Sequence, residues 1–478
     1  MAQRRHRHAA RRAERAAGVQ GAADERFAVT PARFAARRAA LMAQMPPGAV
    51  AVLTTAPEVR RNADSEYLYR HDSHFYYLTG FTEPEAAVVL VAAHGDAPAR
   101  SILFCRQKNI DREIWEGYRH GPQAARAEFG FDEAYAIEAL DEQMSKLLCD
   151  VPALYYPLAR AAGCGHDSAG STLDARVAGW LSAVRAKARS GVTAPAGTID
   201  LLPLLDEMRL RKDEGEQATM LRAAQISAQA HIRAMRAARP GMHEYELEAE
   251  LLYEFRRNGA QAPAYNSIVA AGANACTLHY SANNAQTRDG DLVLIDAGCE
   301  LDGYASDITR TFPVNGRFSA PQKRLYELVL AAQAAALQAM QPGLPYAGAH
   351  EAAVRVLAQG MLELGLLQGS LDEIIAEKRY TQFYMHGTGH WLGMDVHDVG
   401  QYRDVTQTDK PSRLLEPGMV VTVEPGIYVR PADGVPEEYW NIGIRIEDDV
   451  LITAEGHTIL SADAPKSVAE IEELMQQP

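Results

Sequence analysis

Hydrophobic positions follow strand-like and helix-like patterns in the first part of this chain. The apolar runs EAAVVLVAA (85–93) and RSILFCRQ (100–107) have the length and composition of buried strands. TLDARVAGWLSAVRAKAR (172–189) instead has the pattern of an amphipathic helix. These patterns predict an α/β domain over residues 27–200. We expect its boundary in SGVTAPAGTIDLLP (190–203), which is rich in Gly, Pro and Thr.

A pair of long helices is predicted next. Asp213 and Glu216 have the spacing of a capping box, which marks a helix start. Residues with high helix propensity then continue to Arg239, where Pro240-Gly241 ends the helix. HEYELEAELLYEFRRNG (243–259) reads as the second helix of the pair.

The same order returns about a hundred residues later. Ser319 and Gln322 form another capping box, and an Ala-rich helix runs to Gln341, before Pro342-Gly343. AHEAAVRVLAQGMLELG (349–365) is the following helix, and strand-like sequence follows each pair. We therefore predict an α+β domain over residues 206–478 with an internal, pseudo-twofold repeat.

Composition bounds the class of protein. The 478 residues are enough for two domains, 47% are hydrophobic, and no apolar run approaches the roughly 18 residues that cross a bilayer. The net charge of −14 disfavours nucleic acid and anionic membranes as partners. The five cysteines are scattered and odd in number, which is typical of reduced thiols in a cytoplasmic protein.

The first 26 residues differ from the rest. They are strongly basic and have no apolar core, so they are not a secretory signal. Arginine richness suggests an organelle transit peptide, but no serine precedes Ser65, and Glu14, Asp24 and Glu25 intrude. We favour a disordered basic arm.

Two aspartates flank a predicted hairpin. The apolar run 292–295 ends in Asp296, Asp302-Gly303 is a turn signal, and Asp307 lies in the returning strand. An antiparallel hairpin sets the two carboxylates roughly opposite each other, which is unfavourable unless a cation lies between them. The alternative is a pair of solvated aspartates beside a turn, but the flanking residues are too apolar for an exposed hairpin.

Two glutamates recur in strand-like sequence near the C-terminus. Glu424 ends the apolar run of MVVTVEPGIYV (419–429). In NIGIRIEDDVLIT (441–453) the isoleucines alternate with polar residues, so that Arg445 and Glu447 share one face. The alternative interpretation is an Arg–Glu pair on the surface.

The stretch HGTGHWLGMDVHDVG (386–400) carries three histidines. His386 and His390 have the spacing of the helical zinc-protease pair, but no glutamate lies between them and the intervening glycines disfavour a helix. With Asp296, Asp307, Glu424 and Glu447, one or more of these histidines would complete an oxygen-rich site. Four carboxylates match two divalent cations, and such a site suits manganese better than a single zinc.

These segments together resemble the metal-dependent pita-bread peptidases. LIDAG, YASDITRTFPVNG, HGTGHWLGMDVHDVG, TVEPGIY and GIRIEDD occur in the order found in bacterial Xaa-Pro aminopeptidases, also called aminopeptidase P. The resemblance extends over about residues 27–470 and includes NADSEYLYRHDSHFYYLTGFTEPEAAVVLV (62–91). It implies a creatinase-like N-terminal domain, a pita-bread catalytic domain and a two-manganese centre.

The resemblance also implies the metal ligands. By motif they fall on residues of the type that the family uses: Asp296, Asp307, His390, Glu424 and Glu447. Asp307 and Glu447 would bridge the metals, and His390 would be the one nitrogen ligand. His386, His397 and His279 match histidines that line the proline pocket and stabilise the oxyanion, whereas each alone would read as a core histidine.

The implied reaction is release of the N-terminal residue from peptides with proline in the second position. A hydroxide that bridges two metal ions attacks the carbonyl, and Glu424 passes its proton to the proline nitrogen. Arg445 is expected to orient Glu447 or the substrate. Further residues are expected to line the site or that of a neighbouring subunit in a homo-oligomer, a dimer or tetramer; they are Tyr265, Tyr428, Asp64, Arg189 and Trp115.

Three other functions are considered. A proline dipeptidase (prolidase) has the same fold and ligands, but GHWLG and the N-terminal half favour the aminopeptidase. The complete ligand set argues against a metal-free creatinase-type amidinohydrolase and a catalytically dead pita-bread binding protein. DVTQTDKPSRLLEPG (404–418) departs from the family pattern, so outer substrate contacts there are open.

Overall fold

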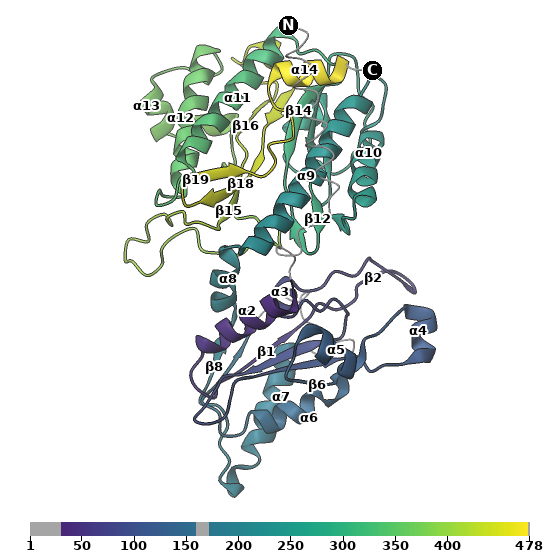
Figure 1. The fold of residues 1–478 in the computed structure, drawn as a ribbon. Helices are drawn as coiled ribbons and strands as arrows, with labels where there is room; N and C mark the ends of the chain where they lie inside the picture. The colour runs from purple at the N-terminus through teal and green to yellow at the C-terminus, as the bar shows by residue number, and fades with distance from the viewer. Residues whose placement is uncertain (1–29, 159–171, 477–478) are drawn as a thin grey trace, which may run out of the picture.

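A computed structural model describes residues 30–158 and 172–476, which form two bodies (Figure 1). The lower body in that view is built on one mixed six-stranded sheet of order β6-β5-β4-β1-β7-β8. Its strands are β1 (Val50–Thr54), β4 (Ala87–Val91), β5 (Arg100–Cys105), β6 (Glu133–Ala136), β7 (Ala153–Tyr156) and β8 (Gly197–Asp200). A small hairpin, β2 (Arg60–Asn62) and β3 (Ser65–Glu66), and several helices complete it. These helices are α2 (Pro31–Ala43), α3 (Ser73–Thr79), α4 (Ile110–Glu116), α5 (Gly121–Phe129), α6 (Leu140–Leu147) and α7 (Leu173–Arg185).

The strands and the helix predicted for this body are present. Both β4 and β5 are almost wholly buried, as their unbroken apolar runs require. Helix α7 begins after Thr172, whose side chain accepts a hydrogen bond from the backbone N–H of Ala175.

The predicted boundary segment contains a further strand. Its residues Gly197–Asp200 form β8, which pairs in parallel with β7 at the edge of the sheet. Short polar edge strands lack an apolar pattern, and only pairing with β7 defines this one. Helix α8 (Leu202–Leu210) then leads to the upper body. The basic arm of residues 1–26 and Cys164 lie outside the described residues, and the four described cysteines are free thiols.

Long helices cover the upper body, where the two predicted pairs occur. They are α9 (Glu214–Ala237) with α10 (Glu244–Arg257), and α11 (Ala320–Ala339) with α12 (Ala347–Glu363). The capping box of Asp213 and Glu216 is present at the start of α9, and the N–H of Ser319 donates to Gln322 at the start of α11. Within the described ranges, no helix has both the length and the apolarity to cross a membrane.

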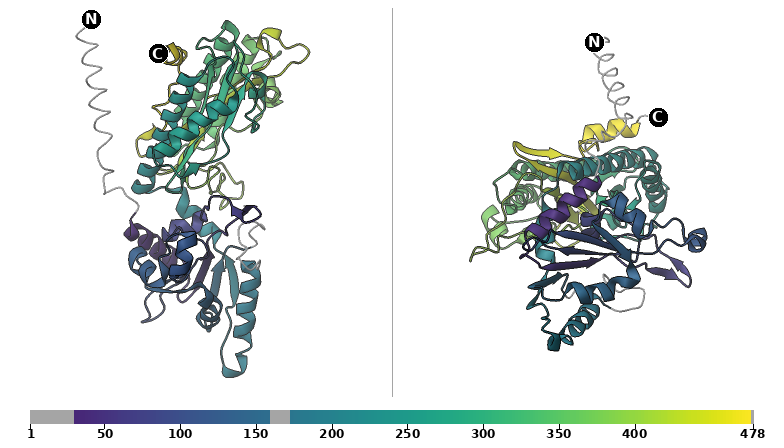
Figure 2. Two further views of the ribbon diagram at one scale, coloured as in Figure 1. Left: turned by 90° about the vertical axis from the view of Figure 1, so that its right-hand side faces the viewer. Right: turned by 60° about the horizontal axis from the view of Figure 1, so that its bottom comes forward.

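The strands of the upper body follow the helix pairs in the predicted repeat. One set comprises β9 (Ala262–Pro263), β10 (Ile268–Ala271), β11 (Leu292–Asp296), β12 (Cys299–Leu301), β13 (Tyr304–Ala305) and β14 (Thr309–Pro313). The other comprises β15 (Val420–Val423), β16 (Gly426–Val429), β17 (Ile442–Arg445), β18 (Asp448–Thr453) and β19 (Gly456–Ile459). Figure 2 shows the strands of this body flanked by its long helices. Figure 1 labels α13 (Leu371–Ala376) beside α12 and α14 (Val468–Gln476) near the C-terminus. Helices and strands share one large apolar core, as a helix–helix–sheet unit predicts.

The predicted hairpin turns at Asp302-Gly303. Both residues have positive φ values, +49° and +79°, as a two-residue type I′ turn requires. A single register runs through the hairpin, with Glu300 opposite Ala305 and Asp296 opposite Thr309. Asp307 lies two residues before Thr309, so the two aspartates are diagonal neighbours on one face rather than directly opposed.

Candidate metal centre

A cavity of about 530 Å³ opens in the upper body and collects most of the predicted site residues. Its lining includes Tyr265, His279, Asp296, Asp307, His386, His390, His397, Glu424, Arg445 and Glu447. They come from both halves of the repeat, because β11 and the hairpin contribute the aspartates and the strands after α12 contribute the glutamates.

Tyr265 ties the two aspartates together. Its hydroxyl lies 2.5 Å from Asp296 Oδ1 and within hydrogen-bond distance of Asp307 Oδ1. The hydroxyl has one proton, so it donates a full hydrogen bond to only one of the two carboxylates at a time. Burial, followed by the charges of the two aspartates, raises the pKa of Tyr265 well above its usual value, so this hydroxyl stays protonated. The shared hydroxyl holds the two carboxylates close to each other at the cavity wall.

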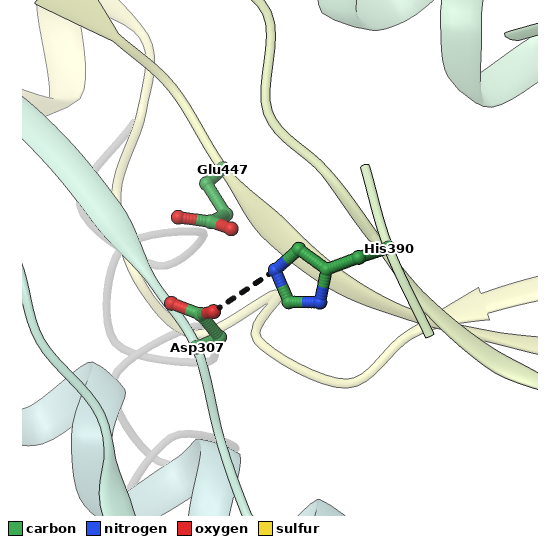
Figure 3. A group of neighbouring side chains, drawn as sticks. All are labelled: Asp307, His390 and Glu447. Carbon is green, nitrogen blue, oxygen red and sulfur yellow. Dashed lines mark ion pairs between the residues drawn. The ribbon is translucent and has the colours of Figure 1, made fainter. Parts of the chain in front are cut away.

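His390 faces the same carboxylates. Figure 3 shows its ring directed at Asp307, with Glu447 above, and the Nε2 atom lies 3.4 Å from Asp307 Oδ2 and 3.6 Å from Glu424 Oε1. Its Nδ1 atom lies 3.0 Å from the carbonyl oxygen of Trp391. Burial lowers the pKa of His390, but the hydrogen bond with Asp307 and the charges of Asp307 and Glu424 outweigh burial and raise it to about 9. With Nδ1–H donated to the carbonyl, Nε2 is the atom that can bind a cation once the cation displaces its proton.

Glu424 follows β15 directly, and its backbone N–H donates to the carbonyl of Thr388, 2.8 Å away. This contact joins the glutamate to the glycine-rich histidine stretch. Burial is the largest cause that raises the pKa of Glu424 to about 7, and the charges of Asp307 and Asp296 act in the same direction. A carboxyl group with a pKa near neutrality can both accept and release a proton at physiological pH.

Glu447 follows β17 and is buried among other carboxylates. Thr309 donates a hydrogen bond of 2.6 Å to Glu447 Oε2. Burial, followed by the charges of Asp307, Glu424 and Asp296, raises the pKa of Glu447 well above its usual value. The ligand atoms of Asp307, His390 and Glu447 all lie within 4.8 Å of one another, close enough for one ion to contact all three.

Arg445 is buried beside these acids, and its expected role in orienting Glu447 or the substrate stays a prediction. It does not ion-pair with Glu447; its Nη2 donates to Asp296 Oδ2 at 2.6 Å. Its Nε reaches Thr309 Oγ1 at 3.1 Å, so Arg445 and Glu447 are linked only through that hydroxyl. Alternation along this strand predicted that both side chains share one face. It could not predict which acid of the other repeat Arg445 would contact.

A short chain of hydrogen bonds connects Arg445 with His386. Arg445 Nη1 donates to Tyr428 Oη over 2.9 Å, and this hydroxyl lies 2.9 Å from His386 Nε2. Burial, followed by the charge of Arg445, lowers the pKa of His386 to about 3. His386 is therefore neutral, accepts from Tyr428 at Nε2, and carries its proton on Nδ1, beside the carbonyl of Gly387. Tyr428 itself is buried behind the cavity wall.

His279 and His397 lie at the open side of the cavity, where both side chains are exposed. The His397 ring packs edge-on against the His390 ring, with 4.3 Å between ring centroids. Burial and the neighbouring His390 lower the pKa of His397. A neutral imidazole at this position can donate a hydrogen bond to an oxygen atom in the cavity.

Besides Tyr428, three predicted substrate-binding residues do not line this cavity. Asp64 lies in the turn between β2 and β3, Trp115 lies on α4 with 86% of its surface exposed, and Arg189 lies in a short 3-10 turn (Ala188–Ser190). All three belong to the lower body, and their contact with a neighbouring subunit's site stays a prediction.

Two further residues, which the sequence did not single out, hold the site. Besides Thr309, the buried Asp449 accepts the backbone N–H of Asp307 through both carboxylate oxygens, at 3.2 Å each. Alternation in SDITRTF places Thr309 on the face of Asp307, so this residue could have been found. Asp449 gave no such signal, because it reads as part of an ordinary polar strand end.

The residues fit a pair of hard divalent cations. Four carboxylates and one nitrogen, converging on one cavity, are the donors that manganese and similar ions prefer. The histidine and the acids also have hydrogen-bond partners that orient them: Trp391 for His390, Thr309 for Glu447 and Tyr265 for the aspartates.

Comparison with known proteins gives a consistent result. Residues 218–454 match the model of metallopeptidase family M24, and residues 34–155 match the aminopeptidase P N-terminal domain. The chain is 47% identical to Xaa-Pro aminopeptidase of Escherichia coli over 442 residues, which cover 92% of this chain and 97% of that protein. The structure of aminopeptidase PepP from Pseudomonas aeruginosa superposes with a TM-score of 0.89 at 50% identity, covering 94% and 98% of the two chains. Zinc-substituted E. coli aminopeptidase P in complex with product superposes with a TM-score of 0.88 at 47% identity, covering 94% and 98%.

Proposed function

The chain belongs to metallopeptidase family M24 and is an Xaa-Pro aminopeptidase, and we propose that five residues of its cavity hold two divalent metal ions. These residues are Asp296, Asp307, His390, Glu424 and Glu447. The fold expected from the resemblance, a creatinase-like α/β domain followed by a pita-bread domain, is that of the family. The boundaries at residues 200 and 206 and the separate arm of residues 1–26 remain proposals.

One observation carries the metal proposal. His390 directs Nε2 at Asp307 and Glu424 while its Nδ1 faces the Trp391 carbonyl, which is the orientation that second-sphere contacts impose on metal-binding histidines. When bound, the two ions would polarise the scissile carbonyl and lower the pKa of the attacking water. We propose manganese as the ion, since oxygen donors outnumber the one nitrogen.

The side chains would then transfer the proton, stabilise the oxyanion and bind the proline ring. Glu424 would accept the proton of the attacking water and deliver it to the proline nitrogen. His397 and His279, at the open side, donate hydrogen bonds to the carbonyl oxygen as it gains charge. Neutral His386, held by Tyr428, lines the pocket for the proline ring.

Specificity for proline is consistent with these roles. The nitrogen of the scissile amide is part of the proline ring and has no N–H to donate. The enzyme must therefore recognise the bond by the shape of the ring and by the free ammonium of the first residue. The substrates are thus peptides with a free N-terminal residue and proline second.

The test is chromatography of products from an Arg-Pro-Pro tripeptide and from Xaa-Pro dipeptides, with and without added manganese. We expect release of free arginine from the tripeptide, a strong increase with manganese, and loss of release in Glu447→Gln and Asp307→Asn. Absence of free arginine under every metal condition would refute the function. Rapid cleavage of the dipeptides with none of the tripeptide would identify the proline dipeptidase, which the comparisons do not favour.

We also propose that the enzyme is a cytoplasmic homo-oligomer. The free state of the four described cysteines supports a reducing compartment. Large apolar side chains exposed on one side of the lower body support self-association, where α4 and the β2–β3 hairpin project (Figure 1). Their exposed fractions are 73% for Ile110, 75% for Ile114, 86% for Trp115 and 74% for Leu68.

A further inference from the structure

Two buried cations lie behind the loop that carries His397 and contact two aspartates of that loop. We name Arg209, Lys212, Asp395 and Asp398 the charged cluster. Arg209 Nη2 is 2.6 Å from Asp398 Oδ1, and Lys212 Nζ is 2.9 Å from Asp398 Oδ2, so each oxygen of this carboxylate meets its own cation. All three side chains are 1% exposed. Arg209 Nη2 also contacts Asp395 Oδ2 at 2.8 Å.

The loop itself is tightly closed around Asp398. The backbone N–H of Asp398 donates to the carbonyl of Trp391 over 2.9 Å, which joins the two ends of the loop. Gly393 packs against the cluster so closely that an added Cβ would lie 2.1 Å from Asp398 Oδ2 and 2.9 Å from Lys212 Cε. Asp398 is therefore fixed through both its backbone and its side chain.

His397 is the residue immediately before Asp398. Within the described part of the chain, no hydrogen bond holds the His397 ring, whose one ring contact is with His390. The direction of this side chain thus depends on the backbone between residues 396 and 398. Whatever fixes Asp398 also aims His397 at the cavity.

The cluster connects this loop to the rest of the molecule. Arg209 lies on α8 and Lys212 just before α9, in the segment that joins the two bodies. From the lower body, Ser73 Oγ donates to Asp395 Oδ1 over 2.6 Å and Arg70 Nη2 to the carbonyl of Met394 over 2.7 Å. The loop is therefore held by groups from outside the catalytic repeat.

We propose that Asp398, held between Arg209 and Lys212, is a positioning residue that aims His397 at the reacting carbonyl, so that the connector between the two bodies sets the geometry of an oxyanion donor. The inference rests on the proposed function, which gives His397 its role.

A double-mutant cycle on the manganese-loaded, full-length enzyme tests the proposal. Kinetics are measured for Lys212→Met, His397→Ala and the double variant, with metal content quantified on the same preparations. Lys212→Met should lower kcat on the order of 10- to 100-fold, as a misplaced catalytic group does, with full metal content. In the His397→Ala background the same change should cost less than about 3-fold, because the group being aimed is gone.

A matched control comes from the neighbouring residue. Arg211 pairs with Glu207 and Glu416 at the surface rather than with the loop, and Arg211→Met should leave kcat within about 2-fold. Equal fold losses from Lys212→Met in both backgrounds would overturn the proposal, because a general structural defect acts independently of His397. Unchanged kcat in Lys212→Met would overturn it as well.

If Lys212→Met gives no folded protein, the same cycle is run with Asp395→Asn. The Asp395 side chain is partly exposed, and asparagine has nearly the same size. The same two outcomes then decide. Failure of the proposed function is distinct, since wild-type enzyme would then release no arginine from the Arg-Pro-Pro peptide. An active wild type with additive effects in the cycle contradicts only the positioning role.

Discussion

Asp307 and Asp449 show how one residue type serves two purposes a few ångströms apart. Asp307 faces the cavity; burial opposes its charge, but the hydrogen bond and charge of His390 outweigh burial and lower its pKa. Asp449 lies behind it and accepts the N–H of Asp307. Burial, followed by the charge of Asp307, raises the pKa of Asp449 well above its usual value. The first acid is placed to bind a cation, and the second fixes the backbone of the first.

Thr309→Val should weaken metal binding. The hydroxyl bridges Arg445 and Glu447, and loss of such an orienting contact typically costs about 10- to 100-fold in metal affinity or activity. Metal titration followed by calorimetry checks this. Thr311→Val is the control, because the Thr311 hydroxyl bonds only the backbone of Arg445. Equal metal affinities for both variants would contradict the role of Thr309.

His397→Ala and His390→Ala should separate turnover from metal content. His397→Ala should lower kcat on the order of 100- to 1000-fold, as loss of an oxyanion donor does, and keep the metals. His390→Ala should lower both, because its Nε2 faces the acids. Steady-state kinetics with metal quantification on the same preparations decide. If His397→Ala loses a metal while His390→Ala retains both, the two roles must be exchanged.

The chelator-treated protein should lose stability as pH rises from about 6.5 to 9. In the fold the pKa of His390 is raised to about 9 and that of Glu424 to about 7, so in this window the native state binds more protons than the unfolded state. Stability then falls with pH, because deprotonation is easier after unfolding. Thermal unfolding at several pH values measures this, and added manganese should reverse the trend. A rise in stability over this window without metal would contradict the shifts.

At the scale of elements, close approach of backbones positions the site. Gly298 lies opposite Asp307 in the hairpin, and a Cβ there would lie 1.7 Å from the carbonyl oxygen of Ser306. Gly389 is similar, because its Cβ would lie 2.0 Å from the carbonyl oxygen of Thr422. Gly298 lets the two strands of the hairpin lie close together, and Gly389 lets the histidine stretch lie against β15.

Gly298→Ala should therefore reduce both stability and metal content. Forcing a methyl group into a packed backbone contact costs about 1–3 kcal/mol and shifts Asp307. Gly179→Ala in α7 is the control, since nothing lies within 4 Å of its added Cβ and alanine favours a helix. Differential scanning calorimetry and metal analysis compare the two variants. A Gly298→Ala protein as stable as wild type would refute the close packing.

At the scale of the whole molecule, the two bodies have different surfaces. The upper body encloses the acidic cavity within its repeat, whereas the lower body exposes apolar side chains on α4 and near β2. Helix α4 buries none of its residues in the single chain. A seven-residue helix is not stable by itself in water, so we expect a partner surface to cover it. This is the physical basis for expecting self-association through the lower body.

Trp115→Ser should lower the mass in solution. Removal of a large exposed aromatic from a subunit contact weakens association by about 2 kcal/mol or more. Light scattering after size exclusion should give a dimer or tetramer for wild type and a smaller species for the variant. Tyr245→Ser, at an exposed position on α10, should leave the mass unchanged. A monomeric wild type would refute the oligomer.

The sequence by itself determined the helix starts, the hairpin turn and the type of site in this protein. Capping boxes at Asp213 and Ser319 and the Asp302-Gly303 turn act over three or four residues, so helix starts and the hairpin could be predicted from neighbours alone. The motif order further indicated the family and a carboxylate-rich metal site. The strand β8 was missed because nothing local marks it.

The tertiary structure alone decided which partner each polar group meets. Arg445 pairs with Asp296 of the other repeat, Asp449 holds the backbone of Asp307, and Asp398 is fixed by Arg209 and Lys212 from the connector. The residues of each pair lie more than a hundred positions apart, and no period or motif links them. Such pairings follow from how the two repeats and the lower body pack, because burial leaves each charge only the partners that packing brings within reach.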